Sequence, residues 1–66
     1  MKFGQVSEWK KHNVNEPWRL ERDDELIEAT WSGFHNAYDC KTINTITGEE
    51  GWSLLTDADL KNAEVL

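Results

Sequence analysis

The chain has 66 residues and a formal net charge of −6, and it contains four tryptophans and one cysteine. A chain of this length makes one small domain, residues 1–66, which buries only about 60% of the surface of the unfolded chain and leaves little room for a deep catalytic cleft. One cysteine excludes an intrachain disulfide, and no apolar run reaches the roughly 18 residues of a membrane span, so we expect a cytoplasmic protein without a membrane anchor.

Charge is distributed unevenly along the chain. Residues 1–22 hold five basic and three acidic residues, a net charge of +2, whereas residues 23–66 hold two basic and ten acidic residues, a net charge of −8. Binding to nucleic-acid phosphates requires clustered lysine and arginine. The sequence therefore argues against a nucleic-acid partner and favours a protein partner with a basic surface.

Tryptophan is the residue type that we expect to stabilise so small a domain. An aromatic side chain buries about 150–250 Å², and tryptophan is also enriched at binding hot spots. Each tryptophan is therefore a candidate for the core, and one or two are candidates for an exposed contact. The four are Trp9, Trp18, Trp31 and Trp52.

The first residues predict a short helix. Phe3, Val6 and Trp9 are spaced three apart, which places them near one helical face over residues 3 to 12. The residue before Pro17 is biased away from helical geometry, so we expect an irregular connection there.

Alternation of side chains predicts two strands after this connection. Residues 18–22 form the first strand and residues 26–31 the second, in which Ile27, Ala29 and Trp31 share one face. The pair Asp23-Asp24 separates them as a turn, because both side chains can bond to nearby backbone.

A third strand is predicted over residues 37–46, which are rich in β-branched side chains. Neither of its two alternating faces is uniformly apolar. Residues 47–51 predict a hairpin loop in which two glycines supply positive φ, and residues 52–55 form the returning strand.

The last residues predict one helical turn and a final strand that closes the sheet or frays. Thr56 and Asp57 are typical of a helix start, and Asp59 lies where the helix dipole favours negative charge. The whole pattern predicts an α+β, mainly β fold: a small, strongly bent antiparallel sheet or SH3-like barrel of three to five strands, with a short N-terminal helix and a C-terminal helical turn. An open three-stranded sheet crossed by the N-terminal helix is the alternative.

Few residues have the chemistry of a catalytic or metal site. His12 and His35 lie in separate segments, and no ligand spacing joins them to Asp39 or Cys40. Cys40 lies between one acidic and one basic neighbour, whose effects on a thiolate cancel, so we expect a core residue and not a nucleophile. We expect no metal, no cofactor and no enzymatic activity.

The candidate contact residues are acidic or aromatic. The acids that follow residue 22 form either a solvated turn or an electrostatic contact, since charges of this kind steer association more than they supply affinity. The candidate partner-binding residues are Asp23, Asp24, Glu25, Glu28, Trp31, Phe34, Tyr38 and Trp52.

These features favour a small acidic protein-interaction module. One form of it is an inhibitor encoded by a phage or mobile element that binds a host protein through an acidic and aromatic surface; mimicry of DNA ranks lower, because the acids form no regular row. The first alternative is a small-ligand-binding domain in which Arg19 or Arg22 pairs with an anionic ligand at a subunit interface. A structural subunit of a larger assembly is the second alternative, and a homo-oligomer stays open.

Overall fold

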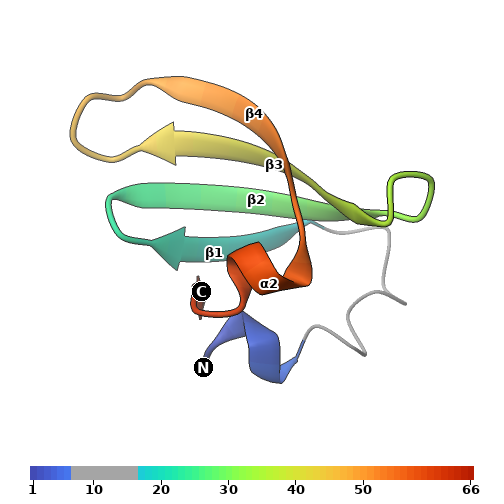
Figure 1. Cartoon of the computed structure of the whole chain (residues 1–66). Helices are drawn as coiled ribbons and strands as arrows, with labels where there is room; N and C mark the ends of the chain where they lie inside the picture. The colour runs from blue at the N-terminus through green and yellow to red at the C-terminus, as the bar shows by residue number, and fades with distance from the viewer. Residues whose placement is uncertain (7–16) are drawn as a thin grey trace.

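The structure is a computed structural model that describes residues 1–6 and 17–66 (Figure 1). The described elements are the 3₁₀ turn η1 (Phe3–Gln5), β1 (Trp18–Arg22), β2 (Glu25–Ser32), β3 (Ala37–Asn44), β4 (Glu50–Leu55), α2 (Asp57–Leu60) and β5 (Glu64–Val65). The predicted helix over residues 3 to 12 is represented by η1, and the rest of that prediction lies outside the described residues. No helix in the described ranges is long and apolar enough to cross a membrane.

All five strands belong to one antiparallel sheet with the order β4-β3-β2-β1-β5. This confirms the prediction of a mainly β fold with three to five antiparallel strands. The sheet is open, with β4 and β5 at its two edges, so the SH3-like barrel is not formed. β5 contributes only two residues and pairs with β1, and no described strand connects it to β4.

Two polar residues with positive φ shape the first two turns. Asp23 has a φ of 51° in the two-residue turn between β1 and β2, and Asn36 has a φ of 52° at the end of the turn before β3. Aspartate and asparagine adopt this left-handed conformation more readily than other side chains do. The predicted Asp23-Asp24 turn is therefore confirmed.

The loop between β3 and β4 departs in one detail from the prediction. Gly48 has a positive φ of 78°, but Gly51 does not and belongs to β4. At Gly51 an added Cβ would lie 3.4 Å from Thr42 Oγ1, an ordinary van der Waals distance, so the packing against β3 does not require glycine there. Thr45 ties this loop to the first turn, since its amide and its hydroxyl donate to the carbonyl oxygen of Asp24 at 2.8 and 3.0 Å.

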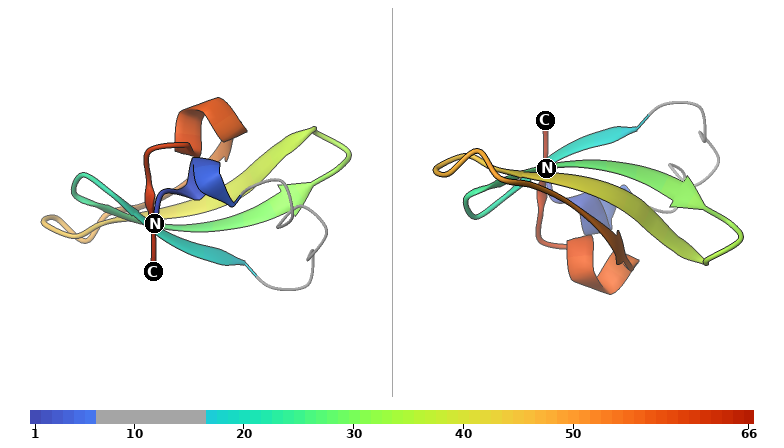
Figure 2. Two further views of the ribbon diagram at one scale, coloured as in Figure 1. Left: turned by 90° about the horizontal axis from the view of Figure 1, so that it is seen from below. Right: turned by 90° about the horizontal axis from the view of Figure 1, so that it is seen from above.

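Alternation divides the strand side chains between two faces of the sheet. One face, which we call the core face, carries all the buried strand residues except Ala37, and η1 and α2 lie together on that side (Figure 2). We call the opposite face the outer face. The buried strand residues of the core face are Leu20, Ile27, Ala29, Tyr38 and Cys40.

The N-terminal turn and the segment after α2 cover the core face together. The Phe3 ring lies 5.1 Å from the Tyr38 ring at a near-perpendicular angle of 75°, and the Phe3 amide donates to the carbonyl oxygen of Ala63 at 2.8 Å. A Cβ at Gly4 would lie 3.0 Å from the Cβ of Lys61, so glycine allows the two segments to pack this closely.

Helix α2 begins as predicted at Thr56. The Asp59 amide donates to Thr56 Oγ1 at 3.3 Å, and the Thr56 amide donates to Asp59 Oδ2 at 3.0 Å. This reciprocal pair is a capping box with aspartate in the third position. The cap starts the turn that places buried Leu60 over the core face.

Candidate functional site

The predicted contact residues are spread over both ends and both faces of the sheet. Asp23 and Asp24 are exposed in the turn between β1 and β2, whereas Phe34, 94% exposed, lies in the turn between β2 and β3. The eight residues of β2 separate these two turns by about 26 Å. The acidic turn and Phe34 therefore cannot form one compact contact.

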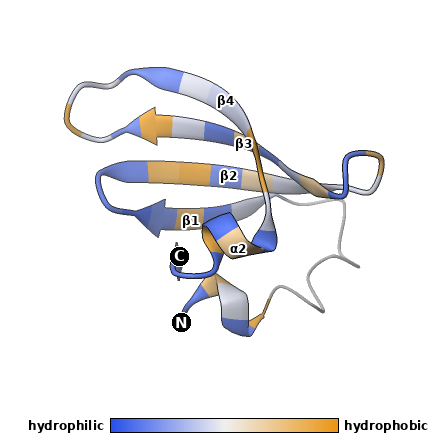
Figure 3. Cartoon of the chain, in the orientation of Figure 1, coloured by the Kyte–Doolittle hydropathy of each residue, from blue (hydrophilic) through white to orange (hydrophobic). Residues whose placement is uncertain are grey.

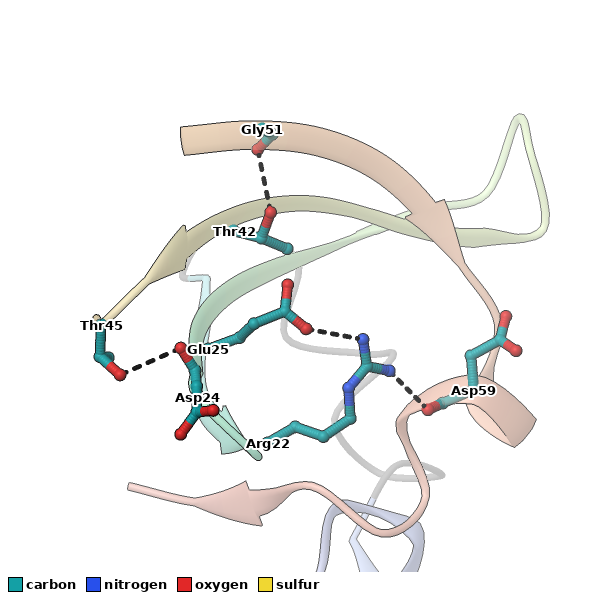
Figure 4. Close-up of polar contacts among 7 residues, drawn as sticks. All are labelled: Arg22, Asp24, Glu25, Thr42, Thr45, Gly51 and Asp59. Carbon is teal, nitrogen blue, oxygen red and sulfur yellow. Dashed lines mark hydrogen bonds and ion pairs between the residues drawn. The ribbon is translucent and has the colours of Figure 1, made fainter. Parts of the chain in front are cut away.

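Glu25 is engaged in the fold at the open end of the core face (Figure 4). Arg22 donates to Glu25 Oε1 at 3.2 Å and to the carbonyl oxygen of Asp59 at 3.1 Å, and so links β1, β2 and α2. The side chains of Arg22 and Glu25 are 30% and 35% exposed. The sequence suggests Arg22 as a residue that could bind an anionic ligand. In the structure its guanidinium group instead holds α2 against the sheet.

Tyr38 is a core residue and has no surface for a partner. It is fully buried, and its ring contacts Phe3 on one side and Trp31 on the other, the latter at 5.0 Å. The register pairs Trp31 with Tyr38, so both side chains point to the core face. Trp31 and Trp18 are half-buried against this core, in agreement with the stabilising role predicted for tryptophan; Trp9 lies outside the described residues.

Glu28 and Trp52 are the members of the predicted set that lie on the outer face. The register places Lys41 between them, opposite Glu28 on one side and opposite Trp52 on the other. Trp52 is 71% exposed although it occupies the middle of a regular strand. It is thus the predicted aromatic contact that the structure places in the open on the sheet itself.

Trp52 belongs to a group of apolar residues that we call the outer-face patch, which consists of Leu26, Ile43, Trp52 and Leu54. Leu26 and Ile43 are directly paired across β2 and β3, where Figure 3 shows hydrophobic residues side by side. Trp52 and Leu54 follow on β4, and Leu54 is 53% exposed. Clustered exposed apolar side chains of this kind are typical of interaction sites.

Three members of the outer-face patch are not contact candidates in the sequence prediction. Leu26, Ile43 and Leu54 lie on one face only because of how the strands pair. The alternation of apolar and polar residues does not fix this pairing when both faces of a strand carry apolar and polar side chains. The sequence does carry one local signal for Leu54. It lies two residues after Trp52 on β4, so the two side chains point to the same face, and Leu55 is then the one large apolar residue of this strand that faces the core.

Charged residues lie within and beside the outer-face patch. Lys41 Nζ lies 3.7 Å from Glu50 Oε1, and both side chains remain partly exposed. Asp39 is paired directly with Leu54 across β3 and β4. The register thus places Glu50 beside Ile43 and Lys41 beside Trp52, so this ion pair lies between the apolar members of the patch.

A hollow of about 370 Å³ adjoins the patch on the side of β1. Arg19 and Glu28 stand at it as charged groups, and Arg19 makes no ion pair with any described residue. The lining residues are Arg19, Leu20, Leu26, Ile27, Glu28, Ile43 and Leu66.

Cys40 is a core residue, as predicted. It is fully buried, and burial together with the nearby Asp39 carboxylate raises the pKa of its thiol to about 11. A nucleophilic cysteine requires the thiolate, whereas this thiol stays protonated at neutral pH.

The described residues also contain no group of three or more histidine, cysteine, aspartate or glutamate side chains that could hold a metal ion. His35 is exposed in the turn between β2 and β3, where its ring lies 5.0 Å from the Phe34 ring. His12 lies outside the described residues.

Comparison of the chain with protein-family models, with curated proteins and with solved structures finds no match.

Proposed function

We propose that the chain is a protein-interaction module that binds a basic partner surface through the outer-face patch. The observation that carries this proposal is the exposure of Trp52 (71%) and Leu54 (53%) two residues apart on one strand. Burial of apolar surface stabilises a fold by about 25 cal/mol per Å². An indole that a small domain leaves exposed on a regular strand therefore indicates a use outside the fold.

The composition of the patch supports a protein partner. Tryptophan is enriched among residues that dominate binding energy, and such residues lie at an apolar centre surrounded by polar groups. Trp52 lies on the edge strand next to Leu54, with Lys41 opposite it and Glu50 and Asp39 beside it. Opposite charges across an interface accelerate association, and the net charge of −8 over residues 23–66 favours a basic partner.

We propose further that the chain acts by binding and not by catalysis. The burial of Cys40 and the raised pKa of its thiol support this, because the strongest nucleophile of the sequence stays protonated and inaccessible at neutral pH. An inhibitor is one form that such a module takes, since a bound domain covers the surface that its partner needs.

Affinity capture from a bacterial lysate tests the proposal with two matched aromatic variants, Trp52→Ser and Phe34→Ser. Phe34 is the control because it is 94% exposed but lies in a turn at the end of the sheet. We expect the wild type and Phe34→Ser to retain a captured protein that Trp52→Ser loses. If Trp52→Ser still retains the captured protein and Asp23→Lys/Asp24→Lys loses it, the site lies on the acidic turn and the proposal is wrong. The proposal is also wrong if the wild type captures no protein.

The hollow beside Arg19 favours a second function, the binding of a small anionic ligand with an apolar body. Its volume of about 370 Å³ lies within the roughly 300–1,000 Å³ range of ligand pockets, and a guanidinium pairs well with carboxylate or phosphate. Anilinonaphthalene sulfonate is a suitable probe. Binding of this dye that Arg19→Gln removes would support the second function, and equal binding by both proteins would exclude it.

A further inference from the structure

The edge strand β4 leaves one side of its backbone unpaired within the described sheet. β4 pairs with β3 on one side and is the last strand in the sheet order. Its six residues span about 20 Å. An edge of this length is long enough to receive another strand.

The register shows which β4 residues direct their backbone groups outward. The Asn44 amide donates to the carbonyl oxygen of Glu49 at 2.8 Å, so these two residues form a hydrogen-bonded pair. Hydrogen-bonded and non-bonded pairs alternate in an antiparallel ladder. The backbone groups of Gly51 and Ser53 therefore point to β3, whereas those of Trp52 and Leu54 point to the open edge.

The side chains of Trp52 and Leu54 stand on the outer face beside that same edge, with exposed fractions of 71% and 53%. A strand added to β4 would hydrogen-bond to these two residues and lay its own side chains against theirs. On the core-face side of β4, Gly51 has no side chain and Ser53 has a short, exposed one. Little bulk therefore obstructs the approach of a second backbone.

Acidic residues lie at the start of β4. Glu49 and Glu50 stand where the strand begins. After the end of β4 the chain crosses to the core face as α2, where the carbonyl oxygen of Asp59 accepts from Arg22 of β1 (Figure 1). Lys41 offsets Glu50 only weakly, because the pair is 3.7 Å apart and partly exposed. The edge thus combines an apolar middle with negative charge at the end where β4 begins.

From this arrangement we propose that β4 receives an extended segment of a partner protein as an additional antiparallel strand, and that this segment has an apolar, β-branched middle with basic residues at the end that meets Glu49 and Glu50. The inference rests on the proposed function, because it uses the outer-face patch as the contact surface and adds the chemistry of the partner.

The first test uses the synthetic peptide Lys-Lys-Val-Thr-Val-Thr-Val-Lys-Lys with blocked termini, titrated into the full chain by calorimetry. In antiparallel addition, the valines lie on the outer face against Trp52 and Leu54, and their amides point toward β4. N-methylation of the valines should therefore weaken binding about tenfold or more, whereas N-methylation of the threonines should leave it within about twofold. Equal effects of the two modifications would overturn the proposal.

The second test changes the domain. Leu54→Pro removes an outward amide without removing a bond to β3, and Leu54→Ala is its control because it removes the side chain alone. We expect Leu54→Pro to bind the peptide about fivefold more weakly than Leu54→Ala does. Equal affinity in two folded variants, checked by their thermal midpoints, would contradict strand addition.

Two matched charge reversals test the acidic start of β4. Glu49→Lys/Glu50→Lys should weaken binding of the basic peptide about tenfold at low salt, whereas Asp23→Lys/Asp24→Lys, an equal change of charge in the turn between β1 and β2, should weaken it much less. Equal losses would mean that only net charge matters and would overturn the proposed placement of the peptide.

The outcomes separate this inference from the function on which it rests. Peptide binding that depends on Trp52 but ignores N-methylation would refute strand addition and leave the outer-face patch as a binding surface. No peptide binding, together with lysate capture that ignores Trp52→Ser, would refute both. Sedimentation of the free protein as a dimer that Leu54→Pro dissociates would identify a second copy of this chain as the occupant and overturn the basic partner.

Discussion

The two faces of the sheet are built from alternate residues of the same strands and differ in what covers them. On the core face, Tyr38 and Cys40 are fully buried beneath η1 and α2. On the outer face of the neighbouring β4, Trp52 and Leu54 remain largely exposed. The contrast shows that apolar content alone does not identify a core in a domain this small, since the position of two short helical turns decides which face is buried.

The difference also separates stability from binding. Removal of a core-face side chain should lower the free energy of unfolding, whereas removal of an outer-face side chain should lower the affinity for a partner. The predictions below test this division, from the largest expected effect on stability to the smallest.

Phe3→Ala should have the largest effect, because Phe3 is fully buried and covers Tyr38. Truncation of a buried phenylalanine costs about 3–5 kcal/mol, and a domain of this size has only about 3–5 kcal/mol in total. The variant should therefore be largely unfolded at 25 °C by circular dichroism. Phe34→Ala, the exposed control, should unfold like the wild type, and a stable Phe3→Ala would refute the covering role of η1.

Thr56→Ala should have an intermediate effect. Thr56 caps α2 in a reciprocal pair with Asp59, and loss of such a cap costs about 1 kcal/mol. The midpoint of urea unfolding should fall, and Thr56→Ser, which retains the hydroxyl, should recover most of the loss. An unchanged midpoint in Thr56→Ala would show that α2 does not depend on its cap.

Two carboxylates should make stability depend on acid pH. Hydrogen bonds from the Thr56 amide and hydroxyl lower the pKa of Asp59, and hydrogen bonds from Lys2 and from the N-terminal ammonium group lower the pKa of Glu64. A lowered pKa in the folded state stabilises that state above the unfolded pKa of about 4, and this contribution is lost as pH falls through the folded pKa.

Thermal midpoints between pH 7 and pH 2 should therefore decline below about pH 4. Asp59→Asn and Glu64→Gln should each lower the midpoint at pH 7 and make the decline smaller. A decline of the same size in both variants would show that other carboxylates cause it.

Trp52→Ser should have the smallest effect on stability, because exposed positions away from caps and buried pairs change the free energy of unfolding by about 0.5 kcal/mol or less. The same substitution should remove the captured partner. A loss of stability as large as that of Phe3→Ala would make Trp52 a core residue and remove the basis for the division between the faces.

Much of the fold could be predicted from the sequence because local rules were sufficient. The Asp23-Asp24 turn, the hairpin succession of β1 to β4 and the cap at Thr56 all depend on residues close together in the chain. The barrel failed as a prediction because closure depends on the length and partner of β5, and no local pattern specifies either of them.

The candidate site is predicted less well, because it depends on which set of alternate β3 residues faces η1 and α2. Both parities carry apolar residues: Tyr38 and Cys40 on one, and Ala37 and Ile43 on the other. The covering turns bury the first parity and leave Ile43 to the outer face. The sequence therefore predicts Tyr38 as a contact although it is a core residue, and it gives no signal for Ile43.

The most direct test of the central claim is a comparison of amide chemical shifts in the free chain and in its complex with the captured protein, by ¹H–¹⁵N nuclear magnetic resonance. The account predicts that the largest changes fall on the outer-face patch and along β4, at Trp52, Leu54 and Ile43. Large changes at Asp23, Asp24 and Phe34, with the patch unaltered, would place the binding surface at the turns and contradict it.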